Sequence, residues 1–173
     1  MKLSLNFLNH CAENEFQQSL AGLVEHSDWV VTAVMLHRPF ASRAELLQAL
    51  MDVITDASPA VQIKLLNVHP ELAGQEAMAS TMAEASSREQ SRLGLTALNV
   101  AQFLRLKALN SSYRSRFGYP CVIALRLHDS LETVFDAFQQ RLQNSPDVEI
   151  AASLQQVRAV VEGRLATLIS TDD

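Results

Sequence analysis

Glycine, proline and cysteine are scarce in this chain of 173 residues, which has five, five and two of them. Few glycines and prolines leave long stretches in which a helix can run without interruption. The two cysteines, Cys11 and Cys121, are too few and too far apart for a disulfide framework, so we expect free thiols in a reducing compartment. A run of about 18 apolar residues, the minimum for a membrane-spanning helix, is also missing.

Clusters of basic residues are missing too. The chain has 14 lysines and arginines against 19 aspartates and glutamates, a net charge of −5, and no basic run. This charge pattern argues against binding to nucleic acid or to an anionic membrane, and favours a small-molecule or protein partner. The start of the chain has no export signal and its last residues, Ser170-Thr171-Asp172-Asp173, are no peroxisomal tripeptide, so we expect a cytoplasmic protein.

The apolar residues, 48% of the chain, recur at intervals of three and four, which predicts an all-α fold. The length suits one core, so we expect residues 1–173 to form a single domain, a compact bundle of several helices. Capping signals place helix starts at Ser42 (with Glu45), Ser58-Pro59 and Ser145-Pro146. The pattern predicts helices at about residues 42–56, from 58 onward, and at about 96–117, 130–141 and 147–169.

Two segments fit this helical pattern poorly. Residues 68–87 are the least helical part, and residues 121–125 are either extended or the start of a helix. Functional residues concentrate in such connections, so candidate site residues are best sought there.

His69 and Glu89 are the candidates for chemistry, and each has a simpler explanation. Pro70 holds the backbone of His69 extended and so aims the imidazole, although the same step also suits a histidine that merely ends a helix. Ser86 and Glu89 have the spacing of a capping box, in which the carboxylate would only satisfy a free amide. The helix start that such a box implies would offer the backbone amides of residues 86–90 to an anion.

Cofactor chemistry finds no support in the sequence. We see no cluster with the spacing of metal ligands and no glycine-rich phosphate loop. Cys121 follows a Gly-Tyr-Pro turn, a position open to a nucleophile, but a buried apolar cysteine is the commoner case. Any reaction would therefore rely on protein acids and bases, with no metal and no cofactor.

Three segments together resemble the family of 2-oxo-4-hydroxy-4-carboxy-5-ureidoimidazoline (OHCU) decarboxylases. They are His69-Pro70-x-Leu72, Glu89-Gln90 and Phe117-Gly118-Tyr119-Pro120, in the family's order and at compatible separations. Weaker similarity begins near Asn6 and runs through most of the chain. Glu71, Tyr119 and Cys121 depart from the residues usual in the family, which affects the shape and polarity of a cavity more than the reacting groups.

The resemblance implies an all-α fold, a homodimer and the cofactor-free conversion of OHCU to (S)-allantoin in urate breakdown. The departing electron pair can move into the adjacent C=N system, so the substrate supplies its own electron sink. In this interpretation His69 and Glu89 form an acid/base pair, and Arg164, otherwise a solvated helix arginine, binds the carboxylate or another substrate oxygen. The expected substrate-binding residues are Pro70, Ser86, Ser87, Arg88, Gln90, Tyr119, Cys121, Val122, Ile123, Ala124, Leu125 and Arg164.

Two alternatives remain open at this point. The chain could be a non-catalytic helical interaction module with an exposed apolar groove, in which Glu89 only caps a helix. It could also use the same scaffold to convert another ureido or imidazoline acid.

Overall fold

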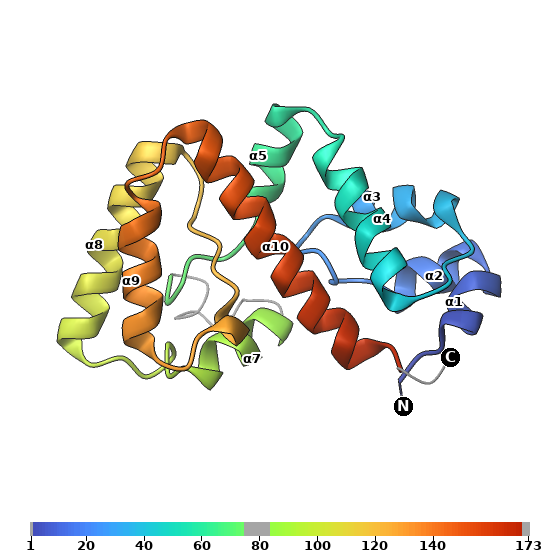
Figure 1. The fold of residues 1–173 in the computed structure, drawn as a ribbon. Helices are drawn as coiled ribbons and strands as arrows, with labels where there is room; N and C mark the ends of the chain where they lie inside the picture. Colours follow the sequence, from blue (N-terminus) through green and yellow to red (C-terminus); the bar gives the residue numbers. More distant parts are fainter. Residues whose placement is uncertain (1, 75–83, 171–173) are drawn as a thin grey trace.

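A long helix, α10 (Pro146–Leu168), crosses the computed structural model diagonally, and the other helices pack along it (Figure 1). The structure describes residues 2–74 and 84–170. Within these residues the fold is all-α, as predicted, and the only β pairing is an isolated parallel bridge between Leu3 and Ile169.

The first half of the chain forms shorter helices, most of which lie around the C-terminal half of α10 (Figure 1). These are α1 (Leu5–His10), α2 (Glu13–Ser19), α3 (Asp28–Val34), the 3₁₀ turn η1 (Met35–His37), α4 (Arg43–Thr55) and α5 (Pro59–Asn67). α4 packs against both α3 and α10. At its start the Ser42 hydroxyl accepts a hydrogen bond from the Glu45 amide, while the Glu45 carboxylate caps Ala41 rather than Ser42. The predicted start of α4 is therefore confirmed, with half of the predicted capping box.

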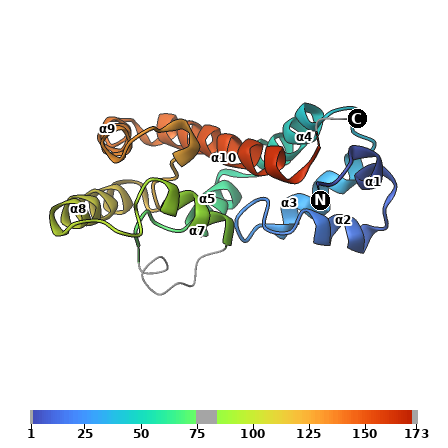
Figure 2. The ribbon, with the colours of Figure 1, turned by 90° about the horizontal axis from the view of Figure 1, so that it is seen from below.

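The second half supplies α7 (Glu84–Arg92), α8 (Val100–Phe117), the 3₁₀ turn η2 (Leu125–Leu127) and α9 (Leu131–Arg141) before α10. α8 and α9 lie side by side near the start of α10 (Figures 1 and 2), and α7 packs against η2. The buried apolar residues of both halves form one continuous cluster. No described helix combines the length and the apolar character that crossing a lipid bilayer requires.

Most of the predicted helix bounds are confirmed to within two residues, and two starts are wrong. α8 begins at Val100, four residues later than expected, because Asn99 and Gln102 form a reciprocal capping box there. α7 begins at Glu84, so Ser86 lies inside the helix and caps nothing. Residues 84–87 of the segment predicted to be least helical are thus helical, and residues 75–83 lie outside the described residues.

Residues 121–124 are extended and lead into η2, which resolves the alternative left open for this segment. The left-handed conformation of Gly118 ends α8 and turns the chain into it. The segment then runs beside α10, to which η2 packs, and faces α7.

Candidate active site

One face of α7 supplies three of the candidate side chains. Ser86, Glu89 and Gln90 are spaced by three and four residues, so the helical period brings them to the same side. Ser87 and Arg88 are rotated away, and the side chain of Arg88 is 69% exposed. The amides of Arg88, Glu89 and Gln90 lie beyond the first turn and are engaged in the helix. These three amides are therefore not free for an anion, and only the start of residues 86–90 remains a candidate for anion binding.

Arg164, from the last turns of α10, crosses to this face. Its Nε and Nη2 atoms each donate to one carboxylate oxygen of Glu89, both at 3.0 Å. Its Nη1 atom donates to the carboxylate of Glu25 at 3.0 Å, and its Nη2 atom also donates to the Ser86 hydroxyl at 3.1 Å. Burial opposes the charge of Arg164, but the hydrogen bonds and negative charges of Glu89 and Glu25 outweigh it and raise the pKa of the guanidinium.

His69 follows the end of α5 and is 9% exposed. Its Nδ1 atom lies 2.9 Å from the carbonyl oxygen of Leu65, which assigns the proton to Nδ1 and leaves the lone pair on Nε2. Burial lowers the pKa of His69 below 6.5, and it outweighs the hydrogen bond to Leu65 and the charge of Glu25, which act in the opposite direction. His69 is therefore a neutral imidazole near pH 7, able to accept a proton.

Gln90 holds the chain that follows His69. Its side-chain oxygen accepts a hydrogen bond from the Ala73 amide at 2.8 Å, and its side-chain nitrogen donates to the Glu71 carbonyl at 3.3 Å. Ala73 adopts a left-handed conformation, with φ of 47°. A strained alanine held by a buried amide indicates that the path of residues 71–73 is tightly specified.

The extended segment 121–124, together with the first residue of η2, is held by three side chains from other elements. Arg141 of α9 donates to the carbonyl of Val122, and Arg92 of α7 donates to the carbonyl of Leu125. The side-chain oxygen of Gln156 accepts a hydrogen bond from the Ala124 amide at 2.9 Å. Burial raises the pKa of the Cys121 thiol to about 12, which keeps it protonated and speaks against a nucleophilic role.

Behind this segment lies a second buried polar cluster, which we call the closed network: Tyr113, Arg141, Glu149 and Ser153. Arg141 donates to the Glu149 carboxylate and to the Ser153 hydroxyl, both at 2.7 Å. The Tyr113 hydroxyl also donates to Glu149, which is fully buried. Tyr119 packs edge-on against Tyr113.

A cavity of about 40 Å³, here called the central cavity, joins the candidate groups. It is lined by His69, Pro70, Leu72, Ser86, Glu89, Gln90, Cys121, Val122, Ile123, Leu125, Val160 and Arg164. An outer hollow of about 550 Å³ adjoins it and shares Glu89, Leu125, Val160 and Arg164. Since ligand pockets usually measure several hundred Å³, a substrate must enlarge the central cavity or enter from the outer hollow.

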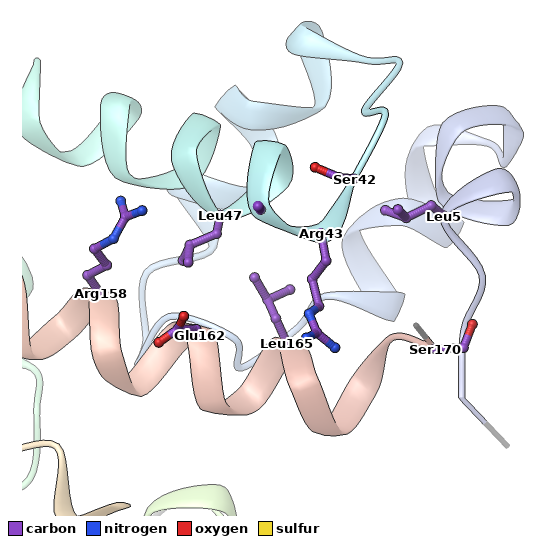
Figure 3. A pocket seen from close by; sticks show the side chains of 9 residues that line it. Leu5, Ser42, Arg43, Leu47, Arg158, Glu162, Leu165 and Ser170 are labelled. Carbon is purple, nitrogen blue, oxygen red and sulfur yellow. The ribbon is translucent and has the colours of Figure 1, made fainter. Parts of the chain in front are cut away.

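A third hollow of about 350 Å³ lies on another side of α10, against α4 (Figure 3). Its charged side chains are Arg43, Arg158 and Glu162, and it is otherwise lined by leucines, serines and an alanine. No histidine lines it. The combination of a neutral imidazole with a carboxylate–arginine pair is thus found, among these three hollows, only at the central cavity.

Ten of the sequence-predicted site residues line the central cavity, and four do not. Arg88 and Ala124 line the outer hollow, whereas Ser87 and Tyr119 line neither. The ring of Tyr119 packs against Tyr113 and Phe117. Glu25, Leu72 and Val160 were missed. Glu25 lies in a loop and meets Ser86 and Arg164 only through tertiary contacts, so no local motif could have identified it.

A metal site is not evident in the part of the chain that the structure describes, where no group of three or more histidine, cysteine, aspartate or glutamate side chains is placed to hold an ion.

Comparison with known proteins supplies a family for this geometry. The family model described as OHCU decarboxylase matches residues 9–166. A protein named OHCU decarboxylase from Haloferax volcanii is 32% identical over 99% of both chains. Another of that name from Mus musculus is 36% identical over 90% of this chain and 86% of its own length.

Solved structures agree on the fold. A crystal structure of (S)-allantoin synthase superposes with a TM-score of 0.77 at 24% identity, covering 99% of this chain and 56% of the other. A crystal structure of OHCU decarboxylase in the presence of (S)-allantoin superposes with a TM-score of 0.68 at 16% identity, covering 87% of this chain and 96% of the other. At these identities the superpositions establish the shared fold alone.

Proposed function

Because the chain belongs to the OHCU decarboxylase family, we propose that its central cavity converts OHCU to (S)-allantoin and carbon dioxide. The observation that carries the proposal is a neutral, oriented His69 in one cavity with the ionic pair Glu89–Arg164. Decarboxylation at a carbon that bears a hydroxyl group needs a base for the hydroxyl proton and a donor that protonates one face of the ring.

His69 is the proton carrier in this mechanism. As the C–CO₂ bond breaks, its electron pair moves into the adjacent C=N system and leaves an enol, and the former C=N nitrogen takes up one proton from solvent. In the next step the enol hydroxyl loses its proton, the carbonyl forms, and the neighbouring ring carbon gains a proton. Nε2 of neutral His69 accepts that proton and returns it to the ring carbon, with the net uptake of one proton from solvent because carboxylate leaves as CO₂. The hydrogen bond from Nδ1 to Leu65 fixes the ring and hence the face that is protonated.

Glu89 acts on the substrate rather than on His69. The described contacts include no hydrogen bond between these two side chains, since Leu65 orients the imidazole and Arg164 engages the carboxylate. The Glu89 carboxylate lines the cavity and can accept a hydrogen bond from the substrate hydroxyl. In this mechanism His69 and Glu89 are therefore not paired with each other, and each acts on the substrate separately.

Backbone amides of the extended segment complete the proposed site. Val122 and Ile123 line the cavity, and no described residue accepts a hydrogen bond from their N–H groups. These amides suit a carbonyl or ureido oxygen, and Pro70 adds an apolar wall. Arg164 can bind the substrate carboxylate only by giving up part of its present partners, because Glu89, Glu25 and Ser86 engage all three of its nitrogens.

The test is a decay assay with OHCU freshly generated from urate, run with and without the protein and in the presence of a chelator. Faster CO₂ release together with optically active (S)-allantoin supports the proposal. Unchanged decay in the presence of folded protein would overturn it, and assays with related ureido and imidazoline acids would then decide between another substrate and the interaction module.

The proposal extends to assembly and location. We propose that the chain is one domain, supported by its continuous apolar cluster, and that it forms a homodimer, for which the exposed Val100 and Leu104 on one side of α8 offer a candidate face. Two free cysteines fit a cytoplasmic site of action. Light scattering coupled to size-exclusion chromatography tests the dimer, and a Leu104→Lys variant tests the face.

A further inference from the structure

The guanidinium of Arg164 has two edges with different surroundings. The Nη1 atom is held by the Glu25 carboxylate at 3.0 Å and by the carbonyls of Gly22 and Leu23 at 3.1 and 3.5 Å. The opposite edge, Nε and Nη2, faces Glu89. One edge is anchored to a fixed loop and the other faces the cavity.

The two carboxylates that pair with Arg164 also differ in their exposure to solvent. The side chain of Glu25 is 2% exposed, whereas that of Glu89 is 34% exposed and lines both the central cavity and the outer hollow. A carboxylate that reaches solvent can leave its arginine at far lower cost than one that would be left charged and unpaired in the interior. Arg164 can therefore exchange Glu89 for another carboxylate while it keeps Glu25.

Glu25 also fixes Ser86, whose hydroxyl donates to the same carboxylate oxygen that Arg164 contacts, at 2.8 Å. The next residue, His26, has a φ of 42°, a left-handed conformation that is strained for a histidine. Such strain persists only where the surroundings specify the backbone strongly. The loop before α3 therefore holds the Glu25 carboxylate in a defined position behind Ser86 and Arg164, which line the central cavity.

We propose that Glu25 is a positioning residue, which anchors Arg164 and Ser86 so that the Nε/Nη2 edge of Arg164 can pass from Glu89 to the carboxylate of the substrate. The proposal rests on the proposed function, since it requires a substrate that carries a carboxylate. Releasing Glu89 enlarges the small cavity and frees that side chain to meet the substrate hydroxyl. The substrate carboxylate thereby takes the place of Glu89 at Arg164, and the released Glu89, which is 34% exposed, is left to solvent and the substrate hydroxyl.

Glu25 also contributes to the charge environment of His69. The charged or titratable groups that act on His69 are Glu25, Arg164 and His26, and Glu89 and Cys121 line the same cavity. The negative charge of Glu25 raises the pKa of His69, while Arg164 and His26 lower it. Removing the charge of Glu25 should therefore lower the pKa of His69 further.

The experiment compares Glu25→Gln, which keeps shape and hydrogen-bonding capacity but removes the charge, with Glu25→Asp, which keeps the charge. We expect kcat/KM for OHCU to fall about 10- to 100-fold in Glu25→Gln, because a loosely held arginine misplaces the substrate. The inhibition constant of (S)-allantoin should change little, because this product has lost the carboxylate that Arg164 binds. Glu25→Asp should recover part of the loss.

An NMR titration of the His69 imidazole supplies a readout that needs no turnover, and its pKa should be lower in Glu25→Gln than in the unmodified protein. The matched control is Glu132→Gln, which removes a carboxylate paired with Arg105 on the surface. Unchanged kcat/KM in folded Glu25→Gln, or equal losses for OHCU and (S)-allantoin, would overturn the proposal. Absence of activity in the unmodified protein would instead overturn the proposed function, and the titration would still report on Glu25.

Discussion

Two buried arginine–carboxylate clusters in this protein have similar chemistry and different surroundings. Arg164 with Glu89 and Arg141 with Glu149 each join a guanidinium that is 10% exposed to a carboxylate and a serine hydroxyl. Glu149 is fully buried and also accepts hydrogen bonds from Tyr113 and Asn144. Glu89 is one-third exposed and borders a cavity that contains a neutral histidine. Ion pairing alone therefore does not mark the reactive site; a cavity, an accessible carboxylate and a nearby base do.

The largest expected effect is on the group that only the cavity cluster has. His69→Asn should lower turnover of OHCU by about 10²- to 10⁴-fold, the usual contribution of general acid/base catalysis. Single-turnover measurements on folded protein at about pH 7.5 check this. A rate near that of the unmodified protein would remove His69 from proton transfer and erase the main functional difference between the clusters.

Matched removal of charge should then separate the two carboxylates. Glu149→Gln should lower the free energy of unfolding by about 3 to 5 kcal/mol, because it leaves Arg141 buried with an uncompensated charge. Glu89→Gln should lower it by about 1 kcal/mol or less, since that side chain reaches solvent, yet reduce turnover by about 10²-fold. Urea unfolding and the OHCU assay measure both quantities, and the reverse pattern would contradict the assignment of roles.

A smaller effect is expected on the pH dependence of the free energy of unfolding. The folded-state pKa of His69 lies below that of the unfolded chain, so the unfolded state binds more protons just below pH 6.5. The contribution of neutral His69 to stability is complete above about pH 6.5 and is lost as the pH falls through the folded-state pKa. Unfolding free energies of the unmodified protein should therefore fall more steeply than those of His69→Asn between about pH 7.5 and 5.5. Parallel curves would show that the imidazole protonates freely in the fold.

The smallest effect tests how tightly the cavity wall is specified. Ala73→Gly should relieve the left-handed strain at φ 47° and change the free energy of unfolding by less than about 1 kcal/mol, because the added freedom of the unfolded chain offsets much of the gain. Thermal unfolding shows whether the substitution raises or lowers stability. A large loss would mean that the methyl group, rather than the backbone path, holds residues 71–73.

The fold was predictable to the extent that its signals are local. Ser42, Ser58-Pro59 and Ser145-Pro146 mark helix starts that the structure confirms, because such signals involve residues only a few positions apart. Ser86 shows the limit of such signals. Its spacing to Glu89 imitates a capping box, but the hydroxyl donates to Glu25, which lies 61 residues earlier in the chain.

The sequence predicted which residues line the site where the family resemblance supplied them. It did not predict the roles that depend on tertiary contacts. His69, Glu89 and Arg164 meet at one cavity as expected. That Leu65 orients His69, or that Glu25 anchors Arg164, follows from burial and distance, which a sequence does not encode locally. Tyr119 follows the turn at Gly118, but its ring packs against Tyr113 and does not line the cavity.

α10 carries members of both clusters on one stripe. Glu149, Ser153, Gln156, Val160 and Arg164 follow at intervals of three and four residues, so a single helix face serves the closed network, the extended segment and the cavity. The distance from the first to the last is about 22 Å along the helix axis. Deleting one residue between Ser153 and Arg164 would turn the guanidinium by about 100° away from Glu89 while the closed network stayed in place. The length of this helix is therefore as much a part of the proposed site as the side chains that it bears.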